Sequence, residues 1–295
     1  MSTPDTLRIH VIGVGKMGLP MARHLLAAGH AVTVEDPSAE RLALAREAGL
    51  GVADGLAGAQ VIVSSLPHDG ALLAASERVA AHAGKEGRGA AWVDTSTVSP
   101  EASARAAEAV ARAGVQSLRC TVSGNNHMAE AAQLTVMASG PKALHERLLP
   151  LLRCWGPTQF WLGEAEEARL MKLVVNLMIA QTRAMLAEAL SLGQKGGLAW
   201  ADMWQVIGAS AVASPIVKAK SVQLSQRDYT PTFTVGQMNK DIDLILGEGA
   251  RLRVPLTQTA ATRQLMSAAQ AQGDAALDYA AIIRVAQRAA GLSTD

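Results

Sequence analysis

A strong helical pattern dominates the stretch of the chain from Gly163 to Gly193. Between Leu170 and Leu192 it is rich in Leu, Met and Ala and contains neither Gly nor Pro, as expected of a strong helix. Because apolar residues lie nearly all round this helix, we expect it to be buried on most sides. Two polar residues, Lys172 and Asn176, interrupt it early, and their i, i+4 spacing places them on one face.

Lys172 has two interpretations from this pattern. A lysine on a buried helix loses its hydration, so it is retained where it is paired or where a lowered pKa is useful. The alternative is that its ammonium group reaches solvent near the helix end. Spacing alone leaves both open.

Upstream of this helix, strand patterns alternate with helical patterns. The expected strands are 8–12, 31–34, 60–66, 91–94 and 115–118, and the expected helices include one closed by Gly29, one over 71–83 and one opened by Ser99-Pro100. Such alternation predicts a parallel sheet covered by helices, with ligands at the carboxyl ends of the strands. Downstream the patterns are helical, most clearly over 237–247 and 256–272.

Two loops fall at those carboxyl ends, Leu66-Pro67-His68 and Thr95-Ser96-Thr97. We expect Leu66, Pro67 and Thr97 to contact a ligand there. Hydroxyl groups at strand ends also serve as local caps, and for Thr97 both roles stay open.

The first expected strand runs directly into Gly13-Val14-Gly15-Lys16-Met17-Gly18, and a helix follows. In this context the three glycines serve, in order, a tight turn, the approach of a pyrophosphate to the backbone, and close packing of helix on strand. The next strand leads to Asp36, which lies 18 residues past the last glycine, near the position of an acid that binds a ribose. The pattern predicts a dinucleotide site.

Asp36 also bears on the choice of cofactor. Its carboxylate would accept hydrogen bonds from the adenosine 2′-OH of NAD and repel the 2′-phosphate of NADP, and Pro37 offers no positive charge. Arg41 is a residue that could reach a 2′-phosphate. We expect NAD, with NADP less favoured.

Composition narrows the function classes. The chain has 295 residues, of which 49% are hydrophobic and 18% charged, and a formal net charge of +1, which argues against nucleic-acid binding or a polybasic membrane surface. Cys120 and Cys154 form no CxxC pair, and the seven histidines show no metal-ligand spacing. With no secretory leader pattern and no uninterrupted apolar run of about 18 residues, we expect a soluble cytoplasmic protein without a metal.

Five motifs follow in order along the chain: GVGKMGLPMARHL, DTSTVSP, TVSGNNHMAEAAQLTVMASG, GEAEEARLMKLVVN and NKDIDL. Together they resemble the β-hydroxyacid dehydrogenase family, which includes 3-hydroxyisobutyrate dehydrogenase and tartronate semialdehyde reductase. The resemblance implies an α/β fold with a Rossmann domain over residues 1–162 and an all-helical domain over 163–295. The long helix that begins near Gly163 would join the two domains.

The resemblance also implies an activity: hydride transfer between a nicotinamide cofactor and a small 3-hydroxy acid or its semialdehyde or keto form. Lys172 falls on the family's catalytic lysine and Asn176 on the asparagine beside it. Thr97 and Lys240 fall on cofactor contacts. Ser123 and Gly124 fall on the pair that binds the substrate carboxylate.

The substrate loop departs from the family pattern. Family members usually carry an acid where Arg119 stands and a glycine where Asn125 stands. With Asn126 and His127, Asn125 makes the loop bulkier and more polar than usual. This predicts substrate contacts from Asn125 and a substrate with an additional polar group, as in a β-hydroxy amino acid; alternatively, these side chains only order the loop.

Two other functions remain open. Imine reductases share the architecture but usually place an acid, Tyr or Asn where Lys172 stands. A non-catalytic NAD-binding protein is the second rival, because a fold does not determine function. The excess of Ala, Leu and Met in the C-terminal helices predicts a homodimer or homotetramer.

Overall fold

The apolar segments of the first half of the chain form an eight-stranded sheet in the computed structural model, which describes residues 6–86 and 90–294. The strands are β1 Arg8–Ile12, β2 Ala31–Glu35, β3 Gly51–Val52, β4 Val61–Ser64, β5 Ala91–Asp94, β6 Gln116–Ser123, β7 Thr135–Ser139 and β8 Thr158–Trp161. Their order across the sheet is β3-β2-β1-β4-β5-β6-β7-β8, and every pair is parallel except β6 and β7.

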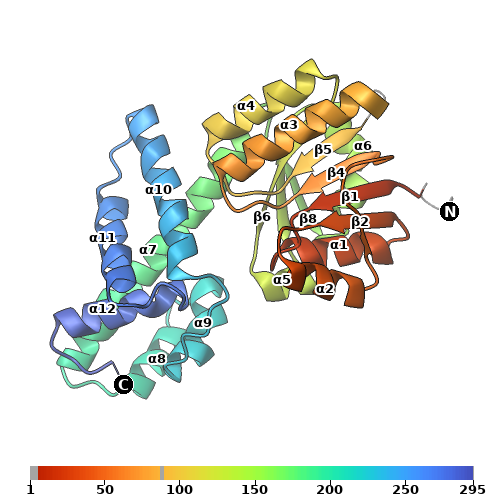
Figure 1. Cartoon of the computed structure of the whole chain (residues 1–295). Helices are drawn as coiled ribbons and strands as arrows, with labels where there is room; N and C mark the ends of the chain where they lie inside the picture. The colour runs from red at the N-terminus through yellow and green to blue at the C-terminus, as the bar shows by residue number, and fades with distance from the viewer. Residues whose placement is uncertain (1–5, 87–89, 295) are drawn as a thin grey trace. The chain divides into compact units, whose positions relative to one another are not determined.

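Helices cover both faces of this sheet. They are α1 Gly18–Ala27, α2 Ala39–Glu47, α3 Asp69–Glu86, α4 Pro100–Arg112, α5 Asn126–Glu130 and α6 Lys142–Leu152. Figure 1 shows α3 and α4 side by side on one face, and α1 and α2 on the other. Successive strand residues point to opposite faces, so Ile9 and Val11 pack with Met21 of α1, whereas Ile62 and Trp92 belong to the core beneath α3 and α4.

The predicted fold class is confirmed: a Rossmann-type α/β sheet is followed by a long helix, α7, that leads into a helical region. The start of α4 is as predicted, because the Ser99 hydroxyl accepts a hydrogen bond from the Ala102 amide at 3.1 Å and Pro100 is the first helical residue. Gly29 follows the end of α1 with a φ of +91°, the conformation expected after a helix.

One prediction about the sheet was wrong. The strand expected over 115–118 is longer than predicted, because β6 continues to Ser123 and pairs there with Val136 and its neighbours in antiparallel β7. The apolar run of a parallel strand is visible in the sequence pattern. The pattern does not reveal that a later strand will pair antiparallel with it and so extend it. The loop begins only at Gly124.

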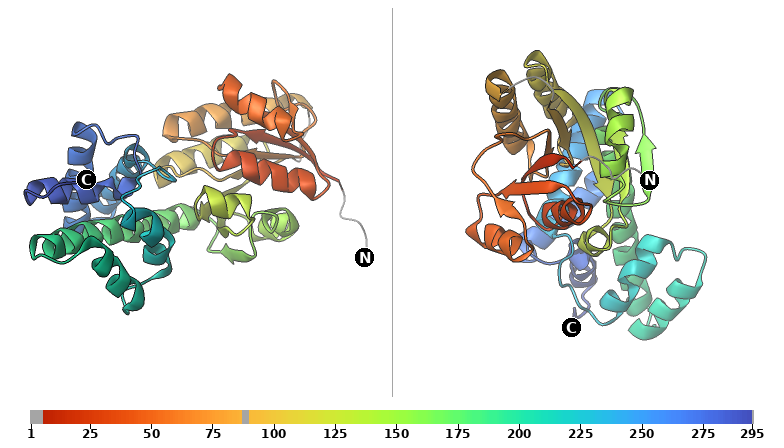
Figure 2. Two further views of the ribbon diagram at one scale, coloured as in Figure 1. Left: turned by 90° about the horizontal axis from the view of Figure 1, so that it is seen from below. Right: turned by 90° about the vertical axis from the view of Figure 1, so that its right-hand side faces the viewer.

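The chain divides into two compact units, Met1–Lys172 and Leu173–Asp295, and the dividing point lies inside α7, Glu167–Lys195. The boundary predicted at residue 162 stays a prediction. The second unit also contains α8 Trp200–Ala209, α9 Pro215–Ser225, α10 Val235–Leu252, α11 Thr257–Ala271, the 3₁₀ turn Tyr279–Ala281 and α12 Ile282–Ala289. These helices pack along the C-terminal part of α7 (Figure 2).

Among the described residues, α7 is the one helix whose length and composition would suffice to cross a membrane. Its side chains argue for a core helix instead, because the Arg183 guanidinium is fully buried and hydrogen-bonds to the Tyr279 hydroxyl and the Ile216 carbonyl. The expectation of burial on most sides is not met in the single chain. Only 44% of its most apolar window is buried, and Met178 and Leu192 are 65% and 77% exposed.

Candidate active site

The turn between β1 and α1 leaves open space where a phosphate is expected. Gly13 has a φ of +90°, and a Cβ there would lie 2.4 Å from the Ser65 carbonyl oxygen. A Cβ on Gly18 would lie 2.0 Å from the Gly13 carbonyl oxygen, whereas one on Gly15 would meet nothing within 4 Å. Since α1 begins here, its free N–H groups and positive dipole end face this space. The cradle fits the pyrophosphate of a dinucleotide.

Asp36 lies against this turn. Its Oδ2 accepts a hydrogen bond from the Val14 amide at 2.8 Å, and its Oδ1 accepts one from the Ser38 amide at 2.9 Å. A carboxylate oxygen has two lone pairs, so each oxygen can accept a second hydrogen bond from a ribose hydroxyl. The predicted ribose acid is therefore held in place beside the glycine turn.

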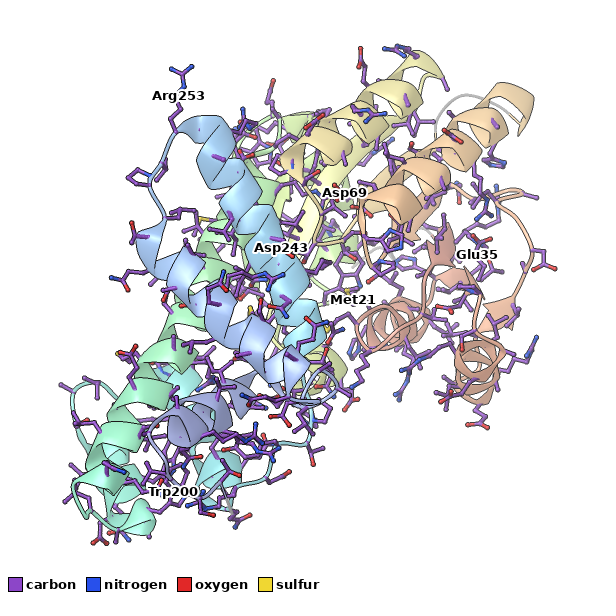
Figure 3. All side chains as sticks on the ribbon, turned by 60° about the vertical axis from the view of Figure 1, so that its left-hand side comes forward. Met21, Glu35, Asp69, Trp200, Asp243 and Arg253 are labelled. Atoms are coloured by element: carbon purple, nitrogen blue, oxygen red, sulfur yellow. The ribbon has the colours of Figure 1, made fainter. Side chains whose placement is uncertain are left out.

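Glu35, labelled in Figure 3, precedes Asp36 and is locked by two basic side chains. Arg78 of α3 donates to both of its carboxylate oxygens, and His10 Nε2 lies 3.3 Å from its Oε2. Burial raises the pKa of Glu35, but the nearby His10 ring and the hydrogen-bonded Arg78 guanidinium outweigh it and bring the pKa down to about 2. The carboxylate tethers the end of β2 to β1 and α3.

The two strand-end loops are joined through a buried hydroxyl. Ser96 Oγ accepts a hydrogen bond from the Leu66 amide at 2.8 Å and donates to Asp94 Oδ1 at 2.7 Å. The Ser64 hydroxyl donates to the same oxygen of Asp94. Ser96 is thus a structural link, while Thr97, the next residue, is half-buried and Pro67 is exposed.

Asp69, labelled in Figure 3, holds the far side of the Thr97 loop. Its carboxylate accepts from the Ser99 amide at 2.9 Å and the Ser99 hydroxyl at 2.6 Å. This fixes the loop from the start of α3. Leu66 also lies close to the glycine turn, because its Cδ2 would be 3.6 Å from a Cβ on Gly13.

The predicted substrate loop connects β6 to α5. Gly124 has a φ of +139°, and a Cβ there would lie 2.6 Å from the Leu134 side chain, so a larger residue does not fit. Asn125 caps α5, since its Oδ1 accepts from the Met128 amide at 3.0 Å. Its oxygen thereby orders the loop, which is the alternative left open by the sequence. Substrate contact by Asn125 stays a prediction; Asn126 Oδ1 is buried without a hydrogen-bond partner among the described residues.

Arg119, whose role the sequence did not reveal, forms an ion pair. Its guanidinium lies 2.7 Å from Glu166 Oε1, immediately before α7, and both side chains are largely buried. The pair attaches β6 to the start of α7. The departure from the family's acidic residue at this position is therefore structural.

Lys172 lies in the second turn of α7 and is half-buried. Asn176, one turn further, is buried, and its Nδ2 donates to Asp241 Oδ2 at 2.6 Å. Lys240 Nζ lies 2.9 Å from the other oxygen of Asp241, a charge contact between neighbouring residues of α10. The structure thus joins two predicted site residues, Asn176 and Lys240, through Asp241, which is 1% exposed and is not part of a solvated surface pair.

The chain resembles known protein families over most of its length. Residues 8–163 match the family described as the NAD-binding domain of 6-phosphogluconate dehydrogenase, and residues 167–286 match the family described as NAD-binding of NADP-dependent 3-hydroxyisobutyrate dehydrogenase. The 2-(hydroxymethyl)glutarate dehydrogenase of Eubacterium barkeri is 31% identical over 293 residues, covering 98% of this chain and 97% of that protein. The chain belongs to the 3-hydroxyisobutyrate dehydrogenase family of β-hydroxyacid dehydrogenases.

Two further relatives agree with this assignment. Glyoxylate/succinic semialdehyde reductase 1 of Arabidopsis thaliana is 29% identical, with 94% of this chain and 97% of that protein covered. A solved structure of Mycobacterium tuberculosis 3-hydroxyisobutyrate dehydrogenase with L-serine has a TM-score of 0.86 at 25% identity, covering 95% of this chain and 99% of that chain. The protein is accordingly an NAD(P)-dependent oxidoreductase of this family.

Sequence reasoning about this family member missed two buried ionic residues, Asp94 and Arg169. Arg169 Nη2 forms an ion pair with Asp94 Oδ2 across two elements, β5 and α7. The sequence offered a weak signal, because a buried arginine within an apolar helix requires a partner. Which acid it meets is decided only by the tertiary fold.

Proposed function

We propose that this protein catalyses reversible, NAD-dependent hydride transfer on a small 3-hydroxy acid, with Lys172 as the acid/base. The observation that carries the proposal is the lysine on a helix whose first turn is hydrogen-bonded to the strands β6 and β7. Thr121 Oγ1 donates to the Ala168 carbonyl at 2.9 Å, and Ser139 Oγ accepts from the Ala168 amide at 3.2 Å. Because these bonds fix the start of α7, the Lys172 amine is kept at a constant distance from a reacting hydroxyl group.

Each residue has a defined task in this proposal. NAD, when bound, would supply the hydride acceptor for oxidation and, in its reduced form, the hydride donor for reduction. Lys172 takes the hydroxyl proton as the alcohol is oxidised and gives it back in the reverse direction. Asn176, oriented by Asp241, directs the hydroxyl group or the lysine. Ser123 and the amide of Gly124 hold the carboxylate.

NAD is the proposed cofactor rather than NADP. The carboxylate of Asp36 is oriented by the Val14 and Ser38 amides, and it would repel a 2′-phosphate while accepting hydrogen bonds from a 2′-OH. Steady-state kinetics with both cofactors test this. A kcat/KM that favours NADP(H) would overturn the NAD assignment. In Asp36→Ala, the values of kcat/KM with NAD and with NADP should be closer to each other than in the unaltered protein.

The proposed substrates are 3-hydroxyisobutyrate, glycerate with its tartronate semialdehyde partner, or a β-hydroxy amino acid. The polar loop from Asn125 to His127 supports the last class, as does the L-serine in the related solved structure. The test compares initial rates for serine, threonine, 3-hydroxyisobutyrate and the glycerate isomers. Absence of any preference for the more polar compounds removes the amino acid class.

The rivals are an imine reductase and a non-catalytic NAD-binding protein. Lys172 favours alcohol chemistry over imine reduction, because an amine can receive the proton that an alcohol loses. A cofactor-reduction assay over the hydroxy-acid panel separates these cases. Binding of NAD without turnover of any hydroxy acid supports a rival function.

We further propose that the protein is a homodimer or a homotetramer. Met178, Met185 and Leu192 recur at seven-residue spacing on α7 and are 65%, 50% and 77% exposed. An exposed apolar stripe with this spacing suits packing against an identical helix. A second copy of the chain is its proposed occupant.

A further inference from the structure

We infer that Arg169 is a positioning residue. It fixes the two loops over residues 66–68 and 95–97, here called the cofactor-side loops, relative to the turn of α7 that carries Lys172. The inference rests on the proposed function, because it assigns Arg169 a part in that same site. All of its contacts lie within the unit Met1–Lys172. It makes no contact with substrate in the proposal and acts through its neighbours.

The guanidinium of Arg169 binds three different elements. It pairs with Asp94 at the end of β5, Nη1 donates to the Ser96 carbonyl at 2.5 Å, and Nε donates to the Ser103 hydroxyl of α4 at 3.0 Å. The side chain is 1% exposed. A planar fork with five donors in fixed directions can satisfy three acceptors at once, which an ammonium group on a flexible stem cannot do with the same geometry.

The contacts of Arg169 extend to both predicted cofactor loops. The Ser96 carbonyl precedes Thr97 directly, so the bond from Nη1 fixes the backbone at that residue. The Ser96 hydroxyl accepts from the Leu66 amide, and Asp94 orients that hydroxyl. One cation therefore restrains Leu66 and Thr97 together, through a short chain of buried hydrogen bonds.

The same side chain belongs to the early part of α7. Lys172 follows Arg169 by three residues, less than one helical turn. If the cofactor-side loops move relative to this turn, the distance between the Lys172 amine and a cofactor bound by the loops changes. A displacement of about 1 Å can cost on the order of 10²-fold in rate, so a rigid link at this point has a kinetic consequence.

The Arg119–Glu166 pair provides a matched control. It also attaches the start of α7 to the sheet, through a largely buried ion pair with a 2.7 Å contact. Arg119 is the register partner of Asp94 across β5 and β6, but among the described residues the side-chain bonds of its guanidinium go to Glu166 and not to Leu66, Ser96 or Asp94. Replacing the Arg119 guanidinium should weaken the attachment of the start of α7 to the sheet. The two cofactor-side loops should stay restrained.

The test compares Arg169→Lys with Arg119→Lys in the full chain, so that each variant keeps its charge. Three measurements are made: hydrogen exchange of peptides covering residues 64–68 and 94–99, the Kd for NAD by calorimetry, and kcat and KM for the best hydroxy acid. For Arg169→Lys we expect faster exchange in both peptides, a Kd raised about 5-fold or more, and kcat lowered about 10- to 100-fold with KM changed less. Arg119→Lys should change none of these by more than about 2-fold.

Unchanged exchange and unchanged NAD affinity in Arg169→Lys overturn the inference, as does an equal effect from Arg119→Lys. If Arg169→Lys does not fold, Arg169→Met combined with Asp94→Asn removes both buried charges together and is measured instead. The proposed function fails separately, when the unaltered protein shows no turnover over the panel. The exchange measurement needs neither cofactor nor substrate and still decides the role of Arg169 in that case.

Discussion

At the scale of single residues, the proposed chemistry depends on the amine of Lys172. Lys172→Ala removes the group that accepts the alcohol proton, so we expect kcat to fall by about 10²-fold or more while the protein stays folded. Initial rates and thermal unfolding measure the two effects. Lys218→Ala, at an exposed position of α9, serves as the control and should keep full activity. Turnover near that of the unaltered protein would remove Lys172 from the mechanism.

Glu35 makes a pH-dependent contribution to stability. Its pKa is about 2 in the folded protein against an ordinary value of 4.5. A lowered pKa means that the folded state prefers the ionised carboxyl, so the stabilisation is present above about pH 4.5 and is lost as the pH falls toward 2. Because Arg78 is half exposed, screening limits the gain to on the order of 2 kcal/mol.

Urea unfolding at about pH 6 and about pH 3 measures this contribution. Glu35→Gln should lose stability at the higher pH and approach the unaltered protein at the lower one. Glu108→Gln is the control, since its pair with Arg112 is exposed on both sides. An equal loss from Glu35→Gln at both pH values would contradict the assigned ion pair.

At the scale of elements, the turn from β1 to α1 separates a structural glycine from a functional one. A Cβ on Gly18 would collide with the Gly13 carbonyl oxygen, whereas one on Gly15 would extend into open space. Gly18→Ala should therefore lower the melting temperature by several degrees, as expected for overpacking of about 1–3 kcal/mol. Gly15→Ala should keep its melting temperature and weaken NAD binding, because its methyl group occupies the path of the pyrophosphate.

Thermal unfolding and NAD titration of the two variants decide this prediction. The two glycines act as controls for each other, since they lie in the same turn. Equal melting temperatures would show that the close approach at Gly18 relaxes at little cost. Unchanged NAD affinity in Gly15→Ala would place the pyrophosphate elsewhere.

At the scale of the whole molecule, α7 carries apolar side chains that the single chain leaves exposed. Met178→Glu combined with Met185→Glu places charges on the exposed stripe, so we expect the homo-oligomer to dissociate into monomers. Light scattering after size-exclusion chromatography measures the mass. Val222→Glu, at a 71% exposed position on α9, is the control and should not change it. An unaltered oligomer in the double variant would exclude this stripe as the interface.

Local pattern was enough to predict the glycine turn, Asp36 and most parallel strands, because each depends on neighbours within a few residues of sequence. It also placed Lys172 and Asn176 on one helix face, since helical spacing is a local property. It missed the strands β3, β7 and β8 and the extension of β6 to Ser123. The extension depends on antiparallel pairing with β7, whose residues come later in the chain.

The sequence by itself determined the family, the nucleotide-binding turn and the residue proposed as acid/base. Only the tertiary structure decided which buried charged and polar groups meet: Arg169 with Asp94, Arg119 with Glu166, and Asn176 with Asp241. The partners in these pairs are separated by 47 to 75 residues in the chain. A buried charge requires a partner, but sequence spacing does not say which distant residue the fold will bring to it.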